Sequence, residues 1–411
     1  MAIDLSRITR PIANLIRPQE ATKTPEAAKP AAPAAADSFE LLSSRVARQA
    51  GAATTPVKYA VLTEKQAGAF AALSPRDQVR YNQVFESISD NAATRMSMRM
   101  LLSANALGSQ STGGKGGTTL DHLETLARNP KLKDGIESKA LLNQLVQDLA
   151  YPHRISQGSD NVICGATAAL TDLALAKPGE YARLAVEMAT EGKAQLSGGK
   201  DADTLKFREL SKENAADRSL TQRLLAVPLL ESAVRDGKVG EDGEVITREG
   251  GWNIFGKNLF GRDVVRHGTV SDQMEAMKAA LHRGAQDEQA FESMYLGDNS
   301  QMNRRQALDV IQDQLNNAST PALKIKEEGG NGHWVTVKGL DAQSGKLEIL
   351  NGRGRTERVD AEELLSRADA LTYNTTVGLS GEVASGAPTN GAELPGGGAK
   401  RGQGSGSIED L

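Results

Sequence analysis

Residues 155–172 read ISQGSDNVICGATAALTD, and they place the single cysteine of the chain, Cys164, where a polar loop passes into an alanine-rich helix. Turn and helix-capping residue types occupy positions 158–161. Small and apolar residues follow the cysteine, and no helix breaker occurs before Pro178. We therefore expect Cys164 in the first turn of a helix, where free N–H groups and the helix dipole stabilise a thiolate. A buried structural cysteine is the alternative, because free cysteine is among the most buried residue types.

Composition excludes several classes of protein. The 48 Lys and Arg residues nearly balance 52 Asp and Glu residues, so a basic surface for nucleic acid is not expected. One cysteine excludes an internal disulfide framework and a cysteine-cluster zinc site, and we expect no metal and no cofactor. Residues 1–20 lack the apolar run of a Sec signal peptide. No window approaches the roughly 18 apolar residues of a membrane span, so the chain is expected to be cytoplasmic as synthesised.

Composition and apolar periodicity along the chain predict four regions. Residues 1–56 are rich in Pro and Ala in part and are expected to be disordered or weakly structured. Residues 57–150 show helical periodicity and are expected to form a helical subdomain. Residues 151–380 are the predicted catalytic domain. Residues 381–411 are rich in Gly and Ser without a core-forming run, and a disordered tail is expected there.

Apolar spacing changes from helical to alternating near residue 320, which predicts an α+β fold. Gly/Ser-rich residues 108–118 are expected to be a linker or surface loop, and residues 236–262 short strands or an ordered loop. The expected helices start at Ser74-Pro75 or span residues 120–127, 141–149, 178–192, 217–235, 271–282, 287–295, 303–316 and 361–367. The expected strands span residues 321–326, 333–340, 346–351, 356–359 and 370–377.

Two polar residues stand at the ends of neighbouring predicted strands. His333 follows a glycine-rich turn and begins one strand, and Asn351, 18 residues later, ends the next. A hairpin of two short strands brings such residues side by side. If the helix that carries Cys164 packs there, His333 can take the thiol proton and Asn351 can orient the imidazole. Asp341 is an alternative orienting residue, and His153 is a minor alternative histidine.

The order Cys-Gly-Ala, then Gly-His-Trp-Val-Thr-Val, then a strand ending in Asn-Gly resembles papain-like cysteine peptidases, in particular the bacterial branch that includes the leader-peptide peptidases of ABC exporters. The resemblance implies a helical layer bearing Cys164 packed on a C-terminal antiparallel sheet bearing His333 and Asn351. It also implies an oxyanion donor before the cysteine, for which Gln157 fits better than Asn161. The family usually has an aromatic or polar side chain near the cysteine that closes one side of the substrate site, whereas Gly, Ala, Thr and Ala follow Cys164 here.

These residues predict a thiol hydrolase, a cysteine peptidase or amidase that attacks a peptide or protein amide through a thioester. Water, an amine or a glutamine side chain remain open as reaction partners, so a deamidase or transglutaminase is an alternative. An inactive papain-like interaction module and a helical scaffold with a buried cysteine are further alternatives. The N-terminal composition is compatible with a bacterial effector or toxin exported by a specialised secretion system, and residues 57–150 with a binding partner of their own.

Overall fold

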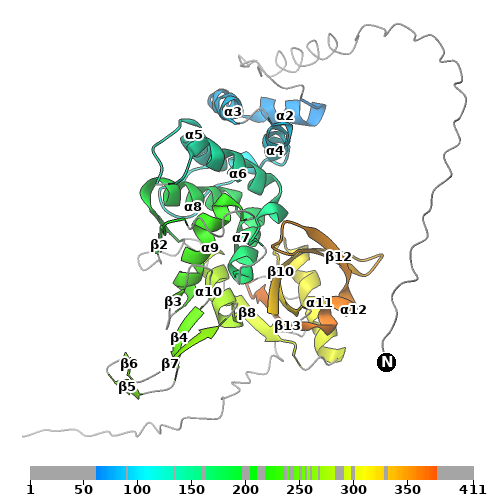
Figure 1. Ribbon diagram of the computed structural model, residues 1–411. Helices are drawn as coiled ribbons and strands as arrows, with labels where there is room; N and C mark the ends of the chain where they lie inside the picture. The colour runs from blue at the N-terminus through cyan, green and yellow to red at the C-terminus, as the bar shows by residue number, and fades with distance from the viewer. Residues whose placement is uncertain are drawn as a thin grey trace, which may run out of the picture.

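In the computed structural model, helices lie on both faces of an antiparallel sheet, which makes the fold α+β (Figure 1). The predictions for residues 1–56 and 381–411 lie outside the residues that the structure describes. Those described are residues 62–88, 91–133, 135–158, 163–196, 204–210, 218–234, 238–239, 245–249, 252–254, 257–259, 262–266, 269–282, 291–297, 301–327 and 332–376.

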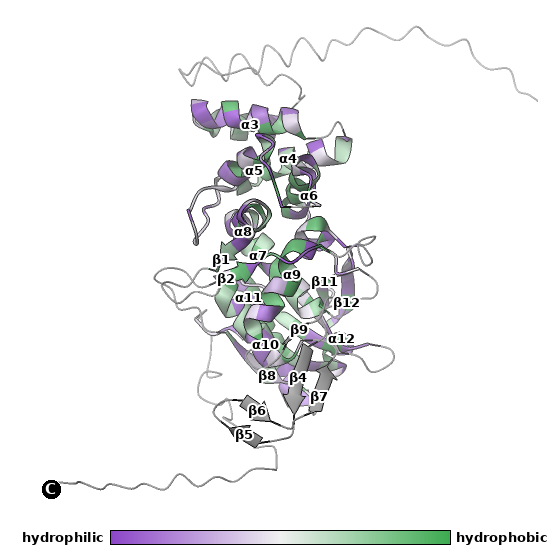
Figure 2. Cartoon of the chain, turned by 60° about the vertical axis from the view of Figure 1, so that its left-hand side comes forward, coloured by the Kyte–Doolittle hydropathy of each residue, from purple (hydrophilic) through white to green (hydrophobic). Residues whose placement is uncertain are grey.

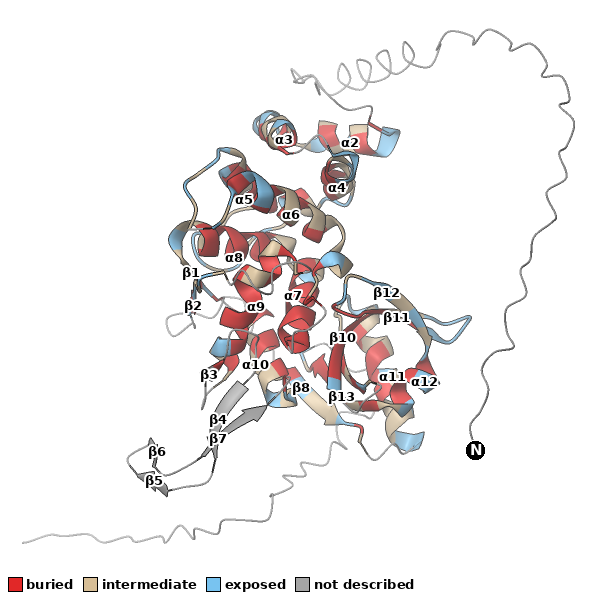
Figure 3. Cartoon of the chain, in the orientation of Figure 1, coloured by how far each residue is buried: buried red, intermediate tan, exposed pale blue. Residues whose placement is uncertain are grey.

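Helix α7 (Cys164–Ala176) is the centre of the fold. Every residue from Cys164 to Ala174 is buried, as Figure 3 shows along the helix. A helix that is apolar on all sides must be surrounded by protein, and Figure 2 shows hydrophobic colouring on α7 and α9 but mixed colouring on α3. The elements packed on α7 are α8 (Pro178–Glu191), α9 (Leu220–Ala233), α10 (Ser271–His282) and β10 (Gly332–Asp341).

The N-terminal helices confirm several predicted starts and stops. Ser74 caps α3 with Pro75 at its first position, and Thr118 and Asp121 form a capping box at α5. Their buried side chains belong to the same apolar cluster as those of α7. The elements are α2 (Glu64–Ala72), α3 (Pro75–Ser87), α4 (Ala92–Ser103), η1 (Ala106–Gly108), α5 (Thr119–Ala127), α6 (Ser138–Ala150) and η2 (Pro152–Arg154).

The main sheet has the strand order β12-β11-β10-β9-β13-β8, and all its pairings are antiparallel. The five predicted C-terminal strands are confirmed, and so are the helices near residues 303–316 and 361–367. The elements are β8 (Phe291–Tyr295), α11 (Gln301–Asn316), β9 (Ala322–Lys326), β10, β11 (Lys346–Leu350), β12 (Thr356–Asp360), α12 (Ala361–Ser366) and β13 (Ala368–Asn374).

The helix predicted over residues 287–295 is wrong where the structure describes it. Residues 291–295 form β8, the edge strand that pairs with β13. A run of five residues is too short for periodicity to distinguish strand from helix. Pairing with β13 decides the outcome, because it supplies hydrogen-bond partners that the local sequence does not reveal.

The two faces of the sheet serve different cores. Trp334 and Ala322 join the cluster around α7, whereas Val335 and Val337 join a second cluster with α11 and α12. This division follows from the alternation of side chains along a strand. The sheet is therefore covered on both faces, with α7 and α10 on one and α11 and α12 on the other.

Of the two expectations for residues 236–262, short strands or an ordered loop, the described residues there form short strands. Smaller strands complete the described elements. They are β1 (Lys193–Gln195), β2 (Thr204–Lys206), β3 (Lys238–Val239), β4 (Val245–Glu249), β5 (Trp252–Ile254), β6 (Lys257–Leu259) and β7 (Arg262–Arg266). Among the described residues, no helix combines the length and the apolar character needed to cross a membrane.

The glycine-rich loop of residues 108–118 is fastened to α8. The main-chain N–H groups of Thr112 and Gly113 donate to Glu180 Oε2 at 2.9 and 3.1 Å. Glu180 also binds the fully buried Arg183, with Oε1 2.7 Å from Nη2. A buried guanidinium needs such partners, so the loop encloses an ion pair and is not a free linker.

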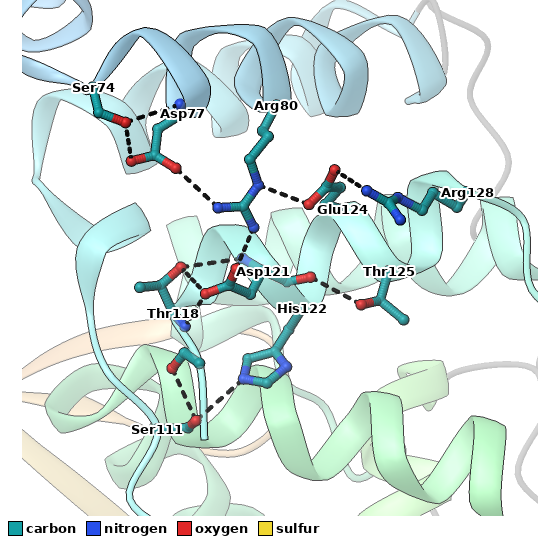
Figure 4. Close-up of polar contacts among 11 residues, drawn as sticks. Ser74, Asp77, Arg80, Ser111, Thr118, Asp121, His122, Glu124, Thr125 and Arg128 are labelled. Atoms are coloured by element: carbon teal, nitrogen blue, oxygen red, sulfur yellow. Dashed lines mark hydrogen bonds and ion pairs between the residues drawn. The ribbon is translucent and has the colours of Figure 1, made fainter. Parts of the chain in front are cut away.

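Figure 4 shows how charges join α3 to α5 above this loop. Arg80 donates to Glu124 Oε2 at 2.7 Å and also pairs with Asp121. Next to Asp121, His122 turns the other way, and its Nε2 lies 3.2 Å from Ser111 Oγ in the loop. Burial lowers the pKa of His122 to about 4, because its surroundings disfavour the charged ring.

This lowered pKa predicts that the folded protein loses stability in acid, and that His122→Gln removes this loss. The unfolded chain binds a proton near pH 6.5 but the folded chain only near 4, so stability falls as pH falls through that window. The difference is worth about 3 kcal/mol. Urea unfolding at pH 7 and pH 4 should show that the variant loses about 3 kcal/mol less than the parent. Equal losses would contradict the assignment.

A second buried cluster ties α7 to α10. Lys278 Nζ and His282 Nε2 each lie 2.9 Å from Asp172 Oδ2, and the Thr320 hydroxyl donates to Asp172 Oδ1. Lys278 Nζ also donates to the Thr320 carbonyl at 2.7 Å. The positive partners lower the pKa of Asp172 although burial alone would raise it.

We expect Asp172→Asn to destabilise the fold by about 3–5 kcal/mol, because it leaves a buried ammonium without its counter-charge. Urea unfolding at pH 7 measures the change. The matched control is Lys115→Ala, because its ion pair with Glu191 lies at the surface, where solvent screens the charges, and its loss should change stability much less. Equal effects of the two substitutions would show that the buried pair contributes no more than a surface one.

Candidate functional site

Cys164 is the first residue of α7, as predicted. Its Sγ accepts hydrogen bonds from the main-chain N–H groups of Gly165 and Trp334. The side chain is 4% exposed, and burial raises the pKa of the thiol despite those two donors. The resting group is therefore the neutral thiol, which differs from the stabilised thiolate that a helix N-terminus alone would favour.

The bond to Trp334 locates the thiol beside the start of β10. The N–H of Val337 donates to Pro321 O, on the β9 side of the strand. Alternate N–H groups of a strand point to opposite sides, so that of Trp334 points to the side of β11, beyond the last residue of that strand. Two further bonds hold β10 to its neighbours: Trp334 Nε1 to Thr269 O at 2.9 Å, and Thr336 Oγ1 to Ala168 O at 3.1 Å.

His333, the residue before Trp334, is also buried, and its Nε2 lies 2.7 Å from the main-chain oxygen of Asn351. A carbonyl oxygen only accepts hydrogen bonds, so Nε2 carries a proton. Burial lowers the pKa of His333, which keeps the imidazole neutral at pH 7. Nδ1 is then without a proton, and the ring can act as a base through that atom.

Asn351 lies beside His333 as predicted, but the contact is made by its main chain. Its Oδ1 accepts from the N–H of Arg353 at 2.9 Å, and its Nδ2 donates to Glu357 Oε1. The amide expected to orient the imidazole is therefore engaged with the turn and with β12. The carbonyl of the same residue fixes the tautomer of His333 in its place.

Gln157 lies next to the first turn of α7. Its main-chain N–H donates to Gly352 O at 2.9 Å, and its carbonyl accepts from Arg218 Nε at 3.2 Å. Gly352 has φ +66°, and a Cβ there would lie 3.4 Å from both Gln157 Oε1 and Thr167 Cγ2. The alternative oxyanion donor, Asn161, lies outside the described residues.

Sequence reasoning missed Glu327, whose charge acts on both the thiol and the imidazole. Glu327, at the end of β9, pairs with Arg353 at 2.6 Å. Because β9 and β11 flank β10, this pair spans the start of β10, where His333 lies. The charge of Glu327 raises the pKa of both Cys164 and His333, so the two share one electrostatic environment.

The alternative residues lie elsewhere. Asp341 is exposed in the β10–β11 turn and binds Ser344 and the N–H of Gln343. His153 lines a hollow of about 560 Å³ together with Ala174 and Leu175, at the other end of α7 from the cysteine. No group of three or more metal-ligating side chains gathers in the described part of the chain.

Gly165, which follows the cysteine, stands where a side chain does not fit. A Cβ at this position would clash with the side chain of Thr269, whose carbonyl holds the Trp334 indole. We expect Gly165→Ala to destabilise the fold by about 1–3 kcal/mol through overpacking, measured by urea unfolding. Gly339→Ala on β10 is the control, since its nearest neighbour would be 3.8 Å away. Equal effects would contradict the crowding.

Comparison of the chain with protein-family models, with curated proteins and with solved structures finds no match. What the site does must therefore follow from its own thiol, imidazole and backbone groups.

Proposed function

We propose that this protein is a thiol hydrolase of papain-like architecture, a cysteine peptidase or amidase. One observation carries the proposal: the thiol of Cys164, at the start of α7, accepts a hydrogen bond from the main-chain N–H of Trp334, the residue after His333. In the sequence, 169 residues separate Cys164 from His333. His333 Nε2 donates to the main-chain oxygen of Asn351, which leaves Nδ1 available as the base. A nucleophile, a base and an orienting group in this order form a thiol-activating arrangement.

In the proposed reaction, His333 Nδ1 takes the proton of Cys164 as Sγ bonds to the amide carbon. The oxyanion is stabilised by the Cys164 N–H and the Gln157 side chain. The imidazolium then gives its proton to the leaving amine as the C–N bond breaks, which leaves a thioester. Water activated by His333 releases the acid and restores the thiol. An amine in place of water would give a transglutaminase, and a glutamine side chain as substrate a deamidase.

The arrangement of the α7 helix on the antiparallel sheet supports the proposal. A buried helix bearing the nucleophile packs on an antiparallel sheet whose central strand bears the base. Peptide and protein amides are the proposed substrates. Peptide cleavage would identify a peptidase, ammonia release without amine incorporation a deamidase, and ammonia release with amine incorporation a transglutaminase.

The second candidate is an inactive interaction module of the same architecture. The observation that favours it is the burial of Cys164, which is 4% exposed and has a raised pKa. Reagents and substrates reach such a thiol only when its surroundings open. The state of the thiol in solution therefore separates the two candidates.

Alkylation of Cys164 by iodoacetamide between pH 5 and 9 tests the hydrolase proposal. We expect the rate to rise as His333 loses its proton, below the usual pH of about 6.5 because its pKa is lowered. His333→Ala should slow alkylation at pH 7 by about tenfold or more, since it removes the base.

His153→Ala is the matched control, because that ring lies at the other end of α7, and it should leave the rate unchanged. Cys164 is the only thiol, so the reaction needs no further assignment. Identical pH profiles in the parent and in His333→Ala would overturn the hydrolase and favour the inactive module.

A further inference from the structure

We propose that Glu357 is a positioning residue for His333, acting through the side chain of Asn351 and supplying the negative charge that a protonated imidazole needs. The inference rests on the proposed function, since a base is positioned only where one is used. Glu357 lies on β12, which is separated from β10, the strand of His333, by β11. It is not one of the residues that the sequence predicts for the site.

The register of the strands brings Glu357 to Asn351. Glu357 pairs with Ile349 across β11 and β12, so their side chains lie on one face. Asn351 follows Ile349 by two residues and therefore continues on that face. Its amide orientation is fixed because Oδ1 accepts from the N–H of Arg353, which leaves Nδ2 to donate to Glu357.

This link holds the carbonyl that binds the imidazole. β11 ends at Leu350, and residues 351–355 turn back toward β12. The amide of Asn351 is clamped on one side by the turn and on the other by Glu357, and its own carbonyl lies 2.7 Å from His333 Nε2. Loss of the carboxylate frees one side of the clamp, and the carbonyl is then held less firmly.

The charges that face His333 come from several elements. Glu327 on β9 and Glu357 on β12 favour the protonated ring, whereas Arg353 in the turn disfavours it. Glu327 and Lys324 of β9 also act on the thiol of Cys164, at the start of α7. Glu327 and Arg353 form an ion pair, so the effect of Glu327 on His333 is offset in part. Within the described residues, Glu357 binds a neutral amide, and its charge adds to that of Glu327 in favouring an imidazolium.

Two substitutions separate the charge of Glu357 from its hydrogen bond. Glu357→Gln keeps an acceptor for Asn351 but removes the charge, and Glu357→Ala removes both. We expect Glu357→Ala to slow alkylation of Cys164 at pH 7 by roughly tenfold and Glu357→Gln to recover part of the loss. Glu348→Ala is the control, because Glu348 lies on neighbouring β11 and pairs with Lys338.

An NMR titration of the five histidines, with His333→Ala to assign the signal, gives a readout that does not depend on reactivity. Both Glu357 variants should lower the titration midpoint of His333, on the order of half a pH unit, while Glu348→Ala leaves it in place. Urea unfolding confirms that each variant is folded at the pH used.

The outcomes separate the two proposals. If His333→Ala slows alkylation but Glu357→Ala stays within about twofold of the parent with an unmoved His333 midpoint, the role of Glu357 is overturned and the hydrolase stands. If His333→Ala changes nothing while Glu357→Gln moves the His333 midpoint, the hydrolase is overturned and the electrostatic link remains. If Glu357→Gln and Glu357→Ala slow the alkylation of Cys164 equally, the positioning role of Glu357 is overturned and only its charge matters.

Discussion

The burial of α7 on all sides is the constraint on which the rest of the structure depends. Its residues from Cys164 to Ala174 are too apolar to leave any face in water. Helices α8, α9 and α10 cover part of it, and β10 covers the remainder. Hydrogen bonds from Thr336 to Ala168 and ion pairs from Asp172 to α10 then fix its position along those neighbours. The N-terminus of α7 consequently lies at the start of β10.

The site is made from backbone groups that the sheet leaves open. Where β11 ends, the N–H of Trp334 no longer faces a strand, and the carbonyl of Asn351 no longer serves one. Buried backbone groups of this kind need partners, and here the thiol of Cys164 accepts from the first while His333 donates to the second. Cys164 and His333 thus complete the hydrogen bonding of the sheet, and the sheet fixes the positions of these two side chains.

Much of this could be predicted from the sequence, because the signals are local. Ser74-Pro75, the run after Cys164 and the alternating strands after residue 320 each determine their own structure. The separation of His333 and Asn351 likewise predicts their proximity through one hairpin. Which atom of Asn351 meets the imidazole could not be predicted, because it depends on Glu357 across a strand pairing. Strand β8 and the anchored loop near Thr112 depend on distant partners in the same way.

The proposed reaction poses one electrostatic problem, because both the thiol of Cys164 and the imidazole of His333 are buried. Burial raises the pKa of Cys164 and lowers that of His333, so both groups rest uncharged. In the proposed reaction, transfer of the proton would create two charges away from water, a cost that protein dipoles and ions would have to offset. The N–H groups of Gly165 and Trp334 face the sulfur, and Glu357 favours the imidazolium. In the proposed reaction these groups are in place before any charge forms, so they would stabilise both charges without reorienting first.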